Sequence, residues 1–177
     1  GMIDASGGVL DQDYEMFEQM TPHRLERHEY LCDSAGPGRF RGGLGVETRY
    51  CVGGEGTQIV VFGDGDVEPA FGLDGGGPGT LNFVELRYPD GRAYRTKSLE
   101  IVRDVPAGTI YTQAAGGGGG FGPPTERPAE RVRDEVKDGL ISVAAAREHY
   151  GVALDSNTLG ILADETARLR GSRSGRA

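Results

Sequence analysis

Clusters of glycine constrain the fold of this chain more than any other feature of its sequence. Glycine accounts for 31 of the 177 residues, and many of these glycines stand in short groups between β-branched or aromatic runs. Glycine adopts backbone conformations that other residues rarely reach, so such groups are typical of sharp turns between short strands. A disordered low-complexity chain would lack the apolar runs in between. We therefore expect a folded β domain rich in turns.

Seven short runs have the character of β-strands. Residues 81–88 and 92–97 flank the turn sequence Pro89-Asp90-Gly91 and predict a β-hairpin. The other predicted strands cover residues 23–32, 45–52, 58–62, 99–102 and 109–114. This spacing predicts a mainly β (α+β) fold with a Gly-rich β-sandwich or barrel-like core of about seven short strands.

Beyond residue 122 the pattern becomes helical, and two or three C-terminal helices are expected. Pro128 can begin a helix that has Val132 and Val136 on one face and ends at Gly139. Two further helices are predicted over residues 143–150, with Ser142 as N-cap and Gly151 as C-terminal cap, and over residues 164–170.

These patterns divide the chain into four consecutive parts. Residues 1–22 form an N-terminal arm, with a short helical turn near residues 14–20 that has no convincing capping residue. The Gly-rich β domain covers residues 23–124, a helical extension covers residues 125–170, and residues 171–177 are expected to fray.

Charge and cysteine content limit the partners and the compartment. The net charge of −8 would repel a phosphate backbone, so nucleic acid is not expected as a partner. No run approaches the ~20 apolar residues of a membrane helix, and no secretory signal is visible. The two cysteines, Cys32 and Cys51, are expected to be reduced thiols. We therefore expect a cytoplasmic protein that does not enter a membrane.

Two segments are candidates for substrate binding or for an interface. Consecutive glycines can present backbone amides to an anion, but a tightly packed or flexible segment that docks on a partner is the commoner reading. Two arginines in an extended segment could clamp one carboxylate, and pairing with local acids is again the commoner arrangement. The candidate residues are Arg39, Arg41, Gly42, Gly43, Gly116, Gly117, Gly118, Gly119, Gly120 and Phe121.

The sequence offers no complete catalytic or metal-binding motif. His23 and His28 lie five residues apart and have no further ligand nearby, so no metal site made by this chain alone is expected. No Gly-x-Ser-x-Gly motif supports a serine hydrolase, and no general base lies near the candidate segments. The catalytic residues stay unknown.

Three ordered motifs resemble the C-terminal region of the hydantoinase B/oxoprolinase family. They are residues 34–45 (SAGPGRFRGGLG), the glycine run with Phe121-Gly122, and a tail that contains residues 126–132, 138–142 and 145–154. The family includes N-methylhydantoinase and 5-oxoprolinase B-type subunits and acetone and acetophenone carboxylases. One departure is Pro123 after Gly122, where the family usually has an aspartate, so no role of that acid is carried over. Residues 52–74 match the family only weakly.

The resemblance implies an ATP-dependent assembly. In such an assembly an A-type subunit phosphorylates a lactam, hydantoin or ketone enolate, and a B-type subunit acts on the activated species. Full B-type subunits are several times longer than this chain, and their metal-binding acids and histidines lie in an N-terminal region that this sequence does not contain. ATP and a divalent metal are therefore expected in partner subunits, and no cofactor is expected on this chain.

Two functional hypotheses follow. The first is a small subunit or C-terminal domain of a hydantoinase/oxoprolinase or ketone carboxylase complex, with larger B-type and A-type subunits as partners and little activity alone. In it, the glycine run and the two arginines face the interface or the substrate cavity. The second is an independent hydrolase or binding domain for a cyclic amide or carboxylate. The substrate, the choice between hydrolase and carboxylase, and a homo-oligomer of the isolated chain are left open.

Overall fold

The computed structural model describes residues 13–174, which form two compact units that alternate along the chain. The first, called the β unit, contains residues 13–29, 46–68 and 81–115. The second, called the glycine–helix unit, contains residues 30–45, 69–80 and 116–174. The predicted limits after residues 22, 124 and 170 stay predictions.

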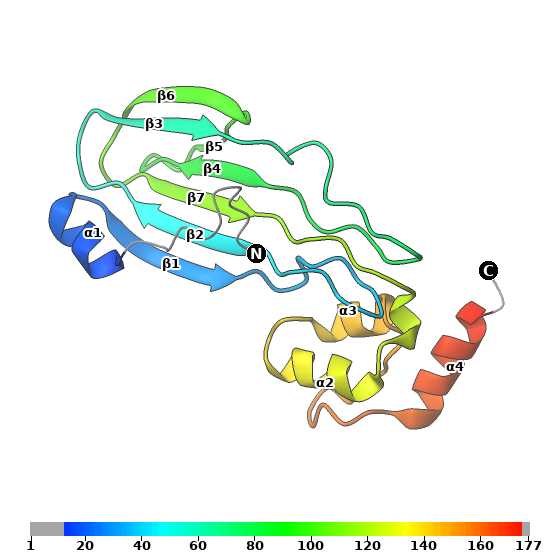
Figure 1. Ribbon diagram of the computed structural model, residues 1–177. Coiled ribbons are helices and arrows are strands. Elements are labelled where there is room, and N and C mark those ends of the chain that lie inside the picture. The colour runs from blue at the N-terminus through cyan, green and yellow to red at the C-terminus, as the bar shows by residue number, and fades with distance from the viewer. Residues whose placement is uncertain (1–12, 175–177) are drawn as a thin grey trace. The chain divides into compact units, whose positions relative to one another are not determined.

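Within residues 13–174, seven strands in two antiparallel sheets make the fold mainly β, as predicted (Figure 1). Five strands form one sheet in the order β1-β2-β7-β4-β5, and β3 pairs with β6 in a separate two-stranded sheet. Leu86, Val105 and Ala114 are almost completely buried in the core of the β unit. The strands are β1 (Arg24–Tyr30), β2 (Val46–Cys51), β3 (Thr57–Phe62), β4 (Phe83–Arg87), β5 (Ala93–Arg95), β6 (Leu99–Val105) and β7 (Ile110–Ala115).

The predicted hairpin is confirmed as the antiparallel pair β4–β5, with Glu85 opposite Arg95. Gly91 adopts a positive φ of 87° in the turn, a conformation that favours glycine. Its amide donates to the Tyr88 carbonyl at 2.9 Å. Asp90 Oδ1 accepts from the Arg92 amide at 3.0 Å, so the local turn chemistry fixes the hairpin.

The short helix α1 (Tyr14–Met20) has a capping residue that sequence reasoning missed. Asp13 Oδ1 accepts a hydrogen bond from the Met16 amide at 3.1 Å, as an N-cap aspartate does. The Phe17 ring lies 5.3 Å from the Tyr50 ring on β2, measured between centroids. The described part of the predicted arm therefore packs on the sheet, and residues 1–12 lie outside the described residues.

The glycine–helix unit has its own apolar core. It is built by α2 (Ala129–Lys137), by α3 (Val143–Glu148) and by the segments that flank α3. The unit also contains the short 3₁₀ helix η1 (Pro124–Glu126) and α4 (Ala163–Ser174). Val132 is completely buried, and Val136 packs against the same cluster as Ile141 and Tyr150, as the predicted helical face requires. Ser142 caps α3 by accepting from the Ala145 amide at 3.0 Å. None of the described helices is long and apolar enough to cross a membrane.

Two helix ends differ from the prediction. Helix α3 ends at Glu148, two residues before the predicted end at Tyr150. Helix α4 continues through Gly171 to Ser174, four residues beyond the predicted end at residue 170. A glycine costs a helix only about 1 kcal/mol relative to alanine, and no proline follows to end it. Residues 175–177 lie outside the described residues.

Candidate functional site

Three extended segments lie side by side in the glycine–helix unit and form what we call the glycine layer (Figure 1). They are residues 34–45, 70–80 and 116–122, and each of them contacts the other two. The Gly36 amide donates to the Gly118 carbonyl at 2.8 Å, and the Gly120 amide donates to the Gly77 carbonyl at 2.9 Å. The Gly77 amide donates to the Pro37 carbonyl at 2.7 Å.

Glycine is required in this layer because the backbones approach too closely for side chains. A Cβ added to Gly42 would lie less than 3.0 Å from the Gly118 carbonyl, and one added to Gly79 would meet the Gly117 carbonyl equally closely. Gly119 has the same relation to Phe71. Real Cβ contacts are essentially never so short, so the glycine clusters are explained by backbone-to-backbone packing as well as by turns.

This packing uses the amides that an anion-binding loop would need. The Gly118 amide donates to the Gly43 carbonyl at 2.9 Å, and the Gly120 amide is bonded as described above. The Gly117 amide donates to Thr80 Oγ1 at 3.2 Å. The geometry therefore favours the packed-segment interpretation of the run over an open anion-binding nest.

The two candidate arginines contact different carboxylates. Arg39 reaches Glu126 at 3.4 Å between exposed side chains. Arg41 Nε donates to Glu135 Oε1 at 3.0 Å, and both side chains of that pair are largely buried. Among residues 13–174 the two guanidinium groups do not meet on one acid, and each pairs with a different glutamate.

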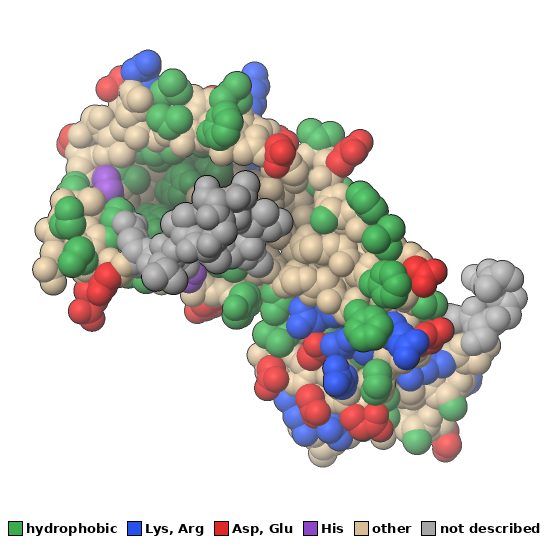
Figure 2. Space-filling view, in the orientation of Figure 1, with side chains coloured by type: hydrophobic (Ala, Val, Ile, Leu, Met, Phe, Trp, Pro, Cys, Tyr) green, Lys and Arg blue, Asp and Glu red, His purple; other side chains and the backbone are tan. Residues whose placement is uncertain are grey.

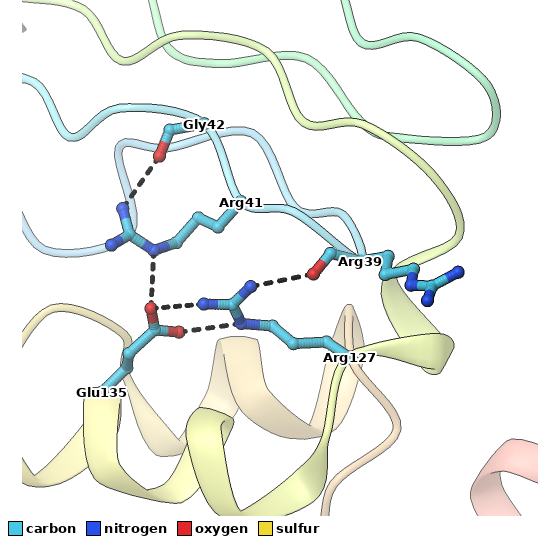
Figure 3. A network of polar contacts seen from close by, with 5 residues as sticks. All are labelled: Arg39, Arg41, Gly42, Arg127 and Glu135. Carbon is cyan, nitrogen blue, oxygen red and sulfur yellow. Dashed lines mark hydrogen bonds and ion pairs between the residues drawn. The ribbon is translucent and has the colours of Figure 1, made fainter.

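A buried charge network surrounds Glu135 (Figure 3). Arg127 binds Glu135 through two hydrogen bonds, Nη2 to Oε1 at 2.7 Å and Nε to Oε2 at 3.1 Å. Arg127 Nη1 also donates to the Arg39 carbonyl at 2.9 Å, which fixes the glycine layer to the base of α2. Sequence reasoning missed Arg127 and Glu135 as partners of Arg41, because 94 residues separate Arg41 from Glu135.

Next to this network lies a cavity of about 340 Å³ within the glycine–helix unit. Its polar wall includes Asp33, Arg41, His149 and Tyr150. Burial raises the pKa of the Tyr150 phenol to about 12, so the phenol keeps its proton at neutral pH. Its apolar wall is formed by Ala35, Pro37, Pro78, Leu140, Ile141 and Ala145.

One edge of the glycine layer carries an exposed apolar patch, which we call the Phe121 patch. Phe40, Leu73 and Phe121 are bridged through their backbones and are 59%, 57% and 48% exposed. The Arg39 guanidinium lies 5.6 Å from the centre of the Phe40 ring. Figure 2 shows hydrophobic side chains on the surface of the glycine-rich segments, whereas charged side chains of both signs crowd the C-terminal helices. Such a patch is typical of a binding surface.

The described residues offer no metal centre of their own. Between residues 13 and 174, no group of three or more His, Cys, Asp or Glu side chains is placed to hold an ion. His23 Nδ1 accepts from the Gly53 amide at 3.3 Å, and His28 Nδ1 lies 2.9 Å from Thr48 Oγ1. Cys32 and Cys51 are free thiols, and burial raises the pKa of the Cys32 thiol, which disfavours the reactive thiolate.

Comparison with known proteins supplies the family. A sequence profile described as hydantoinase B/oxoprolinase matches residues 3–124. The caprolactamase subunit beta of Pseudomonas jessenii is 30% identical over 161 residues, which make up 89% of this chain and 28% of that protein. The chain spans between 23% and 29% of the length of the curated relatives it matches.

Solved structures agree in fold. The nucleotide-free structure of acetone carboxylase superposes with a TM-score of 0.80 at 21% identity, over 94% of this chain and 27% of that chain. The crystal structure of ATP-dependent caprolactamase from Pseudomonas jessenii gives a TM-score of 0.75 at 26% identity, over 90% of this chain and 28% of that chain. On the profile match and these relatives, the chain belongs to the hydantoinase B/oxoprolinase family.

Proposed function

We propose that this chain is a small subunit or C-terminal domain that completes the B-type body of an ATP-dependent hydantoinase/oxoprolinase or ketone carboxylase assembly in the cytoplasm. The observation that carries the proposal is the fold match to ATP-dependent caprolactamase, which covers 90% of this chain but 28% of that chain. This chain therefore corresponds to just over a quarter of the caprolactamase chain that it matches. Larger B-type and A-type polypeptides are the proposed partners.

The surface of the glycine–helix unit supports an interface role. The Phe121 patch exposes three large apolar side chains at neighbouring positions, and Arg39 beside it is more than half exposed. Interfaces are enriched in aromatic side chains and arginine, so this composition suits a protein partner. The candidate site residues Arg39 and Phe121 belong to this surface, whereas Arg41 and Gly116–Gly120 act behind it by fixing the glycine layer.

The chemistry is proposed to lie in the partners. The described residues do not form a cluster of ligands for a divalent metal. In the glycine run, the amides of Gly117, Gly118 and Gly120 donate hydrogen bonds within the unit, so they are not available to a ligand. ATP and a divalent metal are therefore assigned to the larger subunits. Within the assembly this chain stabilises the fold of the B-type subunit and contributes part of the surface around its substrate cavity.

Reconstitution tests the proposal. The A-type and B-type polypeptides from the same source are assayed for ATP-dependent turnover of a cyclic amide, and for carboxylation of a ketone, with and without this chain. We expect activity only in the assembly that contains the chain, and none from the chain alone. Turnover of 5-oxoproline or a hydantoin by the isolated chain, lost on Arg41→Ala, would establish the independent hydrolase instead.

A further inference from the structure

Tyr150 is a buried residue whose hydroxyl the packing does not explain. The residue is 2% exposed and belongs to the apolar core of the glycine–helix unit. Its hydroxyl has no hydrogen-bond partner among residues 13–174, although buried tyrosine hydroxyls usually find one. Within that range Arg49 Nε is the sole fully buried side-chain polar atom without a partner. The Tyr150 hydroxyl therefore keeps accessible surface, and Tyr150 lines the cavity of about 340 Å³.

Arg41 offers a second unused donor at the same cavity. Its Nε donates to Glu135 and its Nη1 donates to the Gly42 carbonyl at 2.9 Å. Figure 3 shows the remaining terminal nitrogen, Nη2, without a bond to any of the residues drawn. Arg41 and Tyr150 both line the cavity, so two polar donors that are far apart in the sequence lie in the wall of the same cavity.

The two unused donors at the cavity suit an anionic acceptor. Arg41 and Arg127 share the single carboxylate of Glu135, and the Asp33 carboxylate in the cavity wall balances the second arginine, so the acceptor is selected by the donors and not by a net positive charge. The Tyr150 phenol, whose pKa burial raises from 10.0 to about 12, is protonated at neutral pH and can donate a hydrogen bond. Asp33 and His149 also line the cavity. Asp33 Oδ1 accepts a hydrogen bond from the Ser142 amide at 2.7 Å.

We propose that this cavity is a binding site for a small aliphatic monocarboxylate. The carboxylate oxygens accept hydrogen bonds from Tyr150 Oη and Arg41 Nη2, and the hydrocarbon body lies against Pro37, Ile141 and Ala145. A charge-assisted pair of donors over an apolar wall is the arrangement by which proteins orient small acids. The site goes beyond the proposed function, because it needs neither partner subunits nor ATP.

Calorimetric titration of the full chain with hexanoate tests the site. We expect saturable binding with one site per chain. Tyr150→Phe removes one hydroxyl and should weaken binding by about tenfold or more, as loss of a hydrogen bond to a charged group does. Tyr30→Phe makes the same chemical change at an exposed position and should leave binding unchanged. Hexanamide, which has the same body without the charge, should bind at least tenfold more weakly.

A second measurement locates the ligand. Nuclear Overhauser contacts between hexanoate protons and the methyl groups of Ile141 and Ala145 are expected in the unmodified chain, so the test does not depend on how well a variant folds. Absence of hexanoate binding, equal affinity for hexanamide, or unchanged affinity in Tyr150→Phe would overturn the proposal. Each of these results would leave the assembly role untouched, because reconstitution with partner subunits tests that role separately.

Discussion

At the scale of single residues, one carboxylate ties the glycine layer to the helices. Glu135 lies between Arg41 and Arg127, and Arg127 is itself 7% exposed. Burying charge is unfavourable unless each group is paired, so removing the acid leaves two guanidinium groups without their partner. No local pattern in the sequence indicates this pairing, because the arginine at position 41 and the acid meet only after folding.

We therefore expect Glu135→Gln to destabilise the chain strongly. Breaking a buried ion pair by removing one partner costs about 3–5 kcal/mol in the free energy of unfolding. Glu126→Gln is the matched control, because its pair with Arg39 is exposed and such pairs contribute about 0–1 kcal/mol. Urea unfolding measures both. Equal stability losses in the two variants would show that the network around Glu135 is not structural.

The Tyr150 phenol gives the chain a specific response to alkaline pH. Its pKa is raised from 10.0 to about 12 in the folded state, chiefly by burial. Between these two values the unfolded chain releases the proton and the folded chain keeps it, so the free energy of unfolding falls as pH rises above 10. Below pH 10 both states are protonated and the group gives no pH dependence.

Tyr150→Phe should therefore lose less stability than the unmodified chain between pH 10 and pH 12. Urea midpoints measured at intervals across this range provide the test, and Tyr30→Phe serves as the control for the chemical change. Parallel pH profiles for Tyr150→Phe and the unmodified chain would mean that this phenol titrates alike in both states.

At the scale of elements, local signals were sufficient to predict most of the strands and helices. The sequence Pro89-Asp90-Gly91 predicted the β4–β5 hairpin because its turn chemistry is confined to neighbouring residues. The capping role of Ser142 was predicted for the same reason. Asp13 shows the limit, since a single capping side chain before a short acidic helix gave too weak a signal.

The arrangement of these elements depends on contacts far apart in sequence. Strand β2 pairs with β7 and not with its neighbour β3, and nothing within either strand specifies that partner. The glycine layer has the same character. Its glycines were predicted to shape turns, but several serve backbone packing between segments that only the folded chain brings together.

The layer makes a position-specific prediction. Gly42→Ala places a methyl group less than 3.0 Å from backbone atoms of Gly118, so the segments must separate. We expect a loss of about 1–3 kcal/mol in the free energy of unfolding, as overpacking typically costs. Gly43→Ala is the matched control, because its Cβ meets nothing within 4 Å and should cost less than about 0.5 kcal/mol. A Gly42→Ala variant as stable as Gly43→Ala would contradict the packed layer.

At the scale of the whole molecule, two compact units present a fold that occupies about a quarter of larger enzymes. The resemblance of three ordered motifs pointed to this family from the sequence, and the profile match shows it. The sequence predicted only part of the surface that is proposed to contact a partner. Phe121 was a candidate, but its neighbours Phe40 and Leu73 join it only through backbone bridges between distant segments.

The Phe121 patch should therefore be sensitive to charge. Phe121→Asp is expected to reduce the recovery of partner polypeptides with an affinity-tagged chain by at least about tenfold, since a charge must then be desolvated at the interface. Phe121→Leu keeps an apolar side chain and should retain most of the recovery. Thermal unfolding of the isolated variants checks that both remain folded. Equal recovery of the partner polypeptides with the two variants would show that the Phe121 patch is not part of the interface.

The proposed assembly is tested most directly by the native mass of the particle that carries this sequence in its source organism. We predict a particle well above the 18.8 kDa of the chain, in which A-type and B-type polypeptides of the hydantoinase/oxoprolinase family are present in fixed ratio. Recovery solely as a free 18.8 kDa monomer, at native expression levels and without such companions, would contradict it.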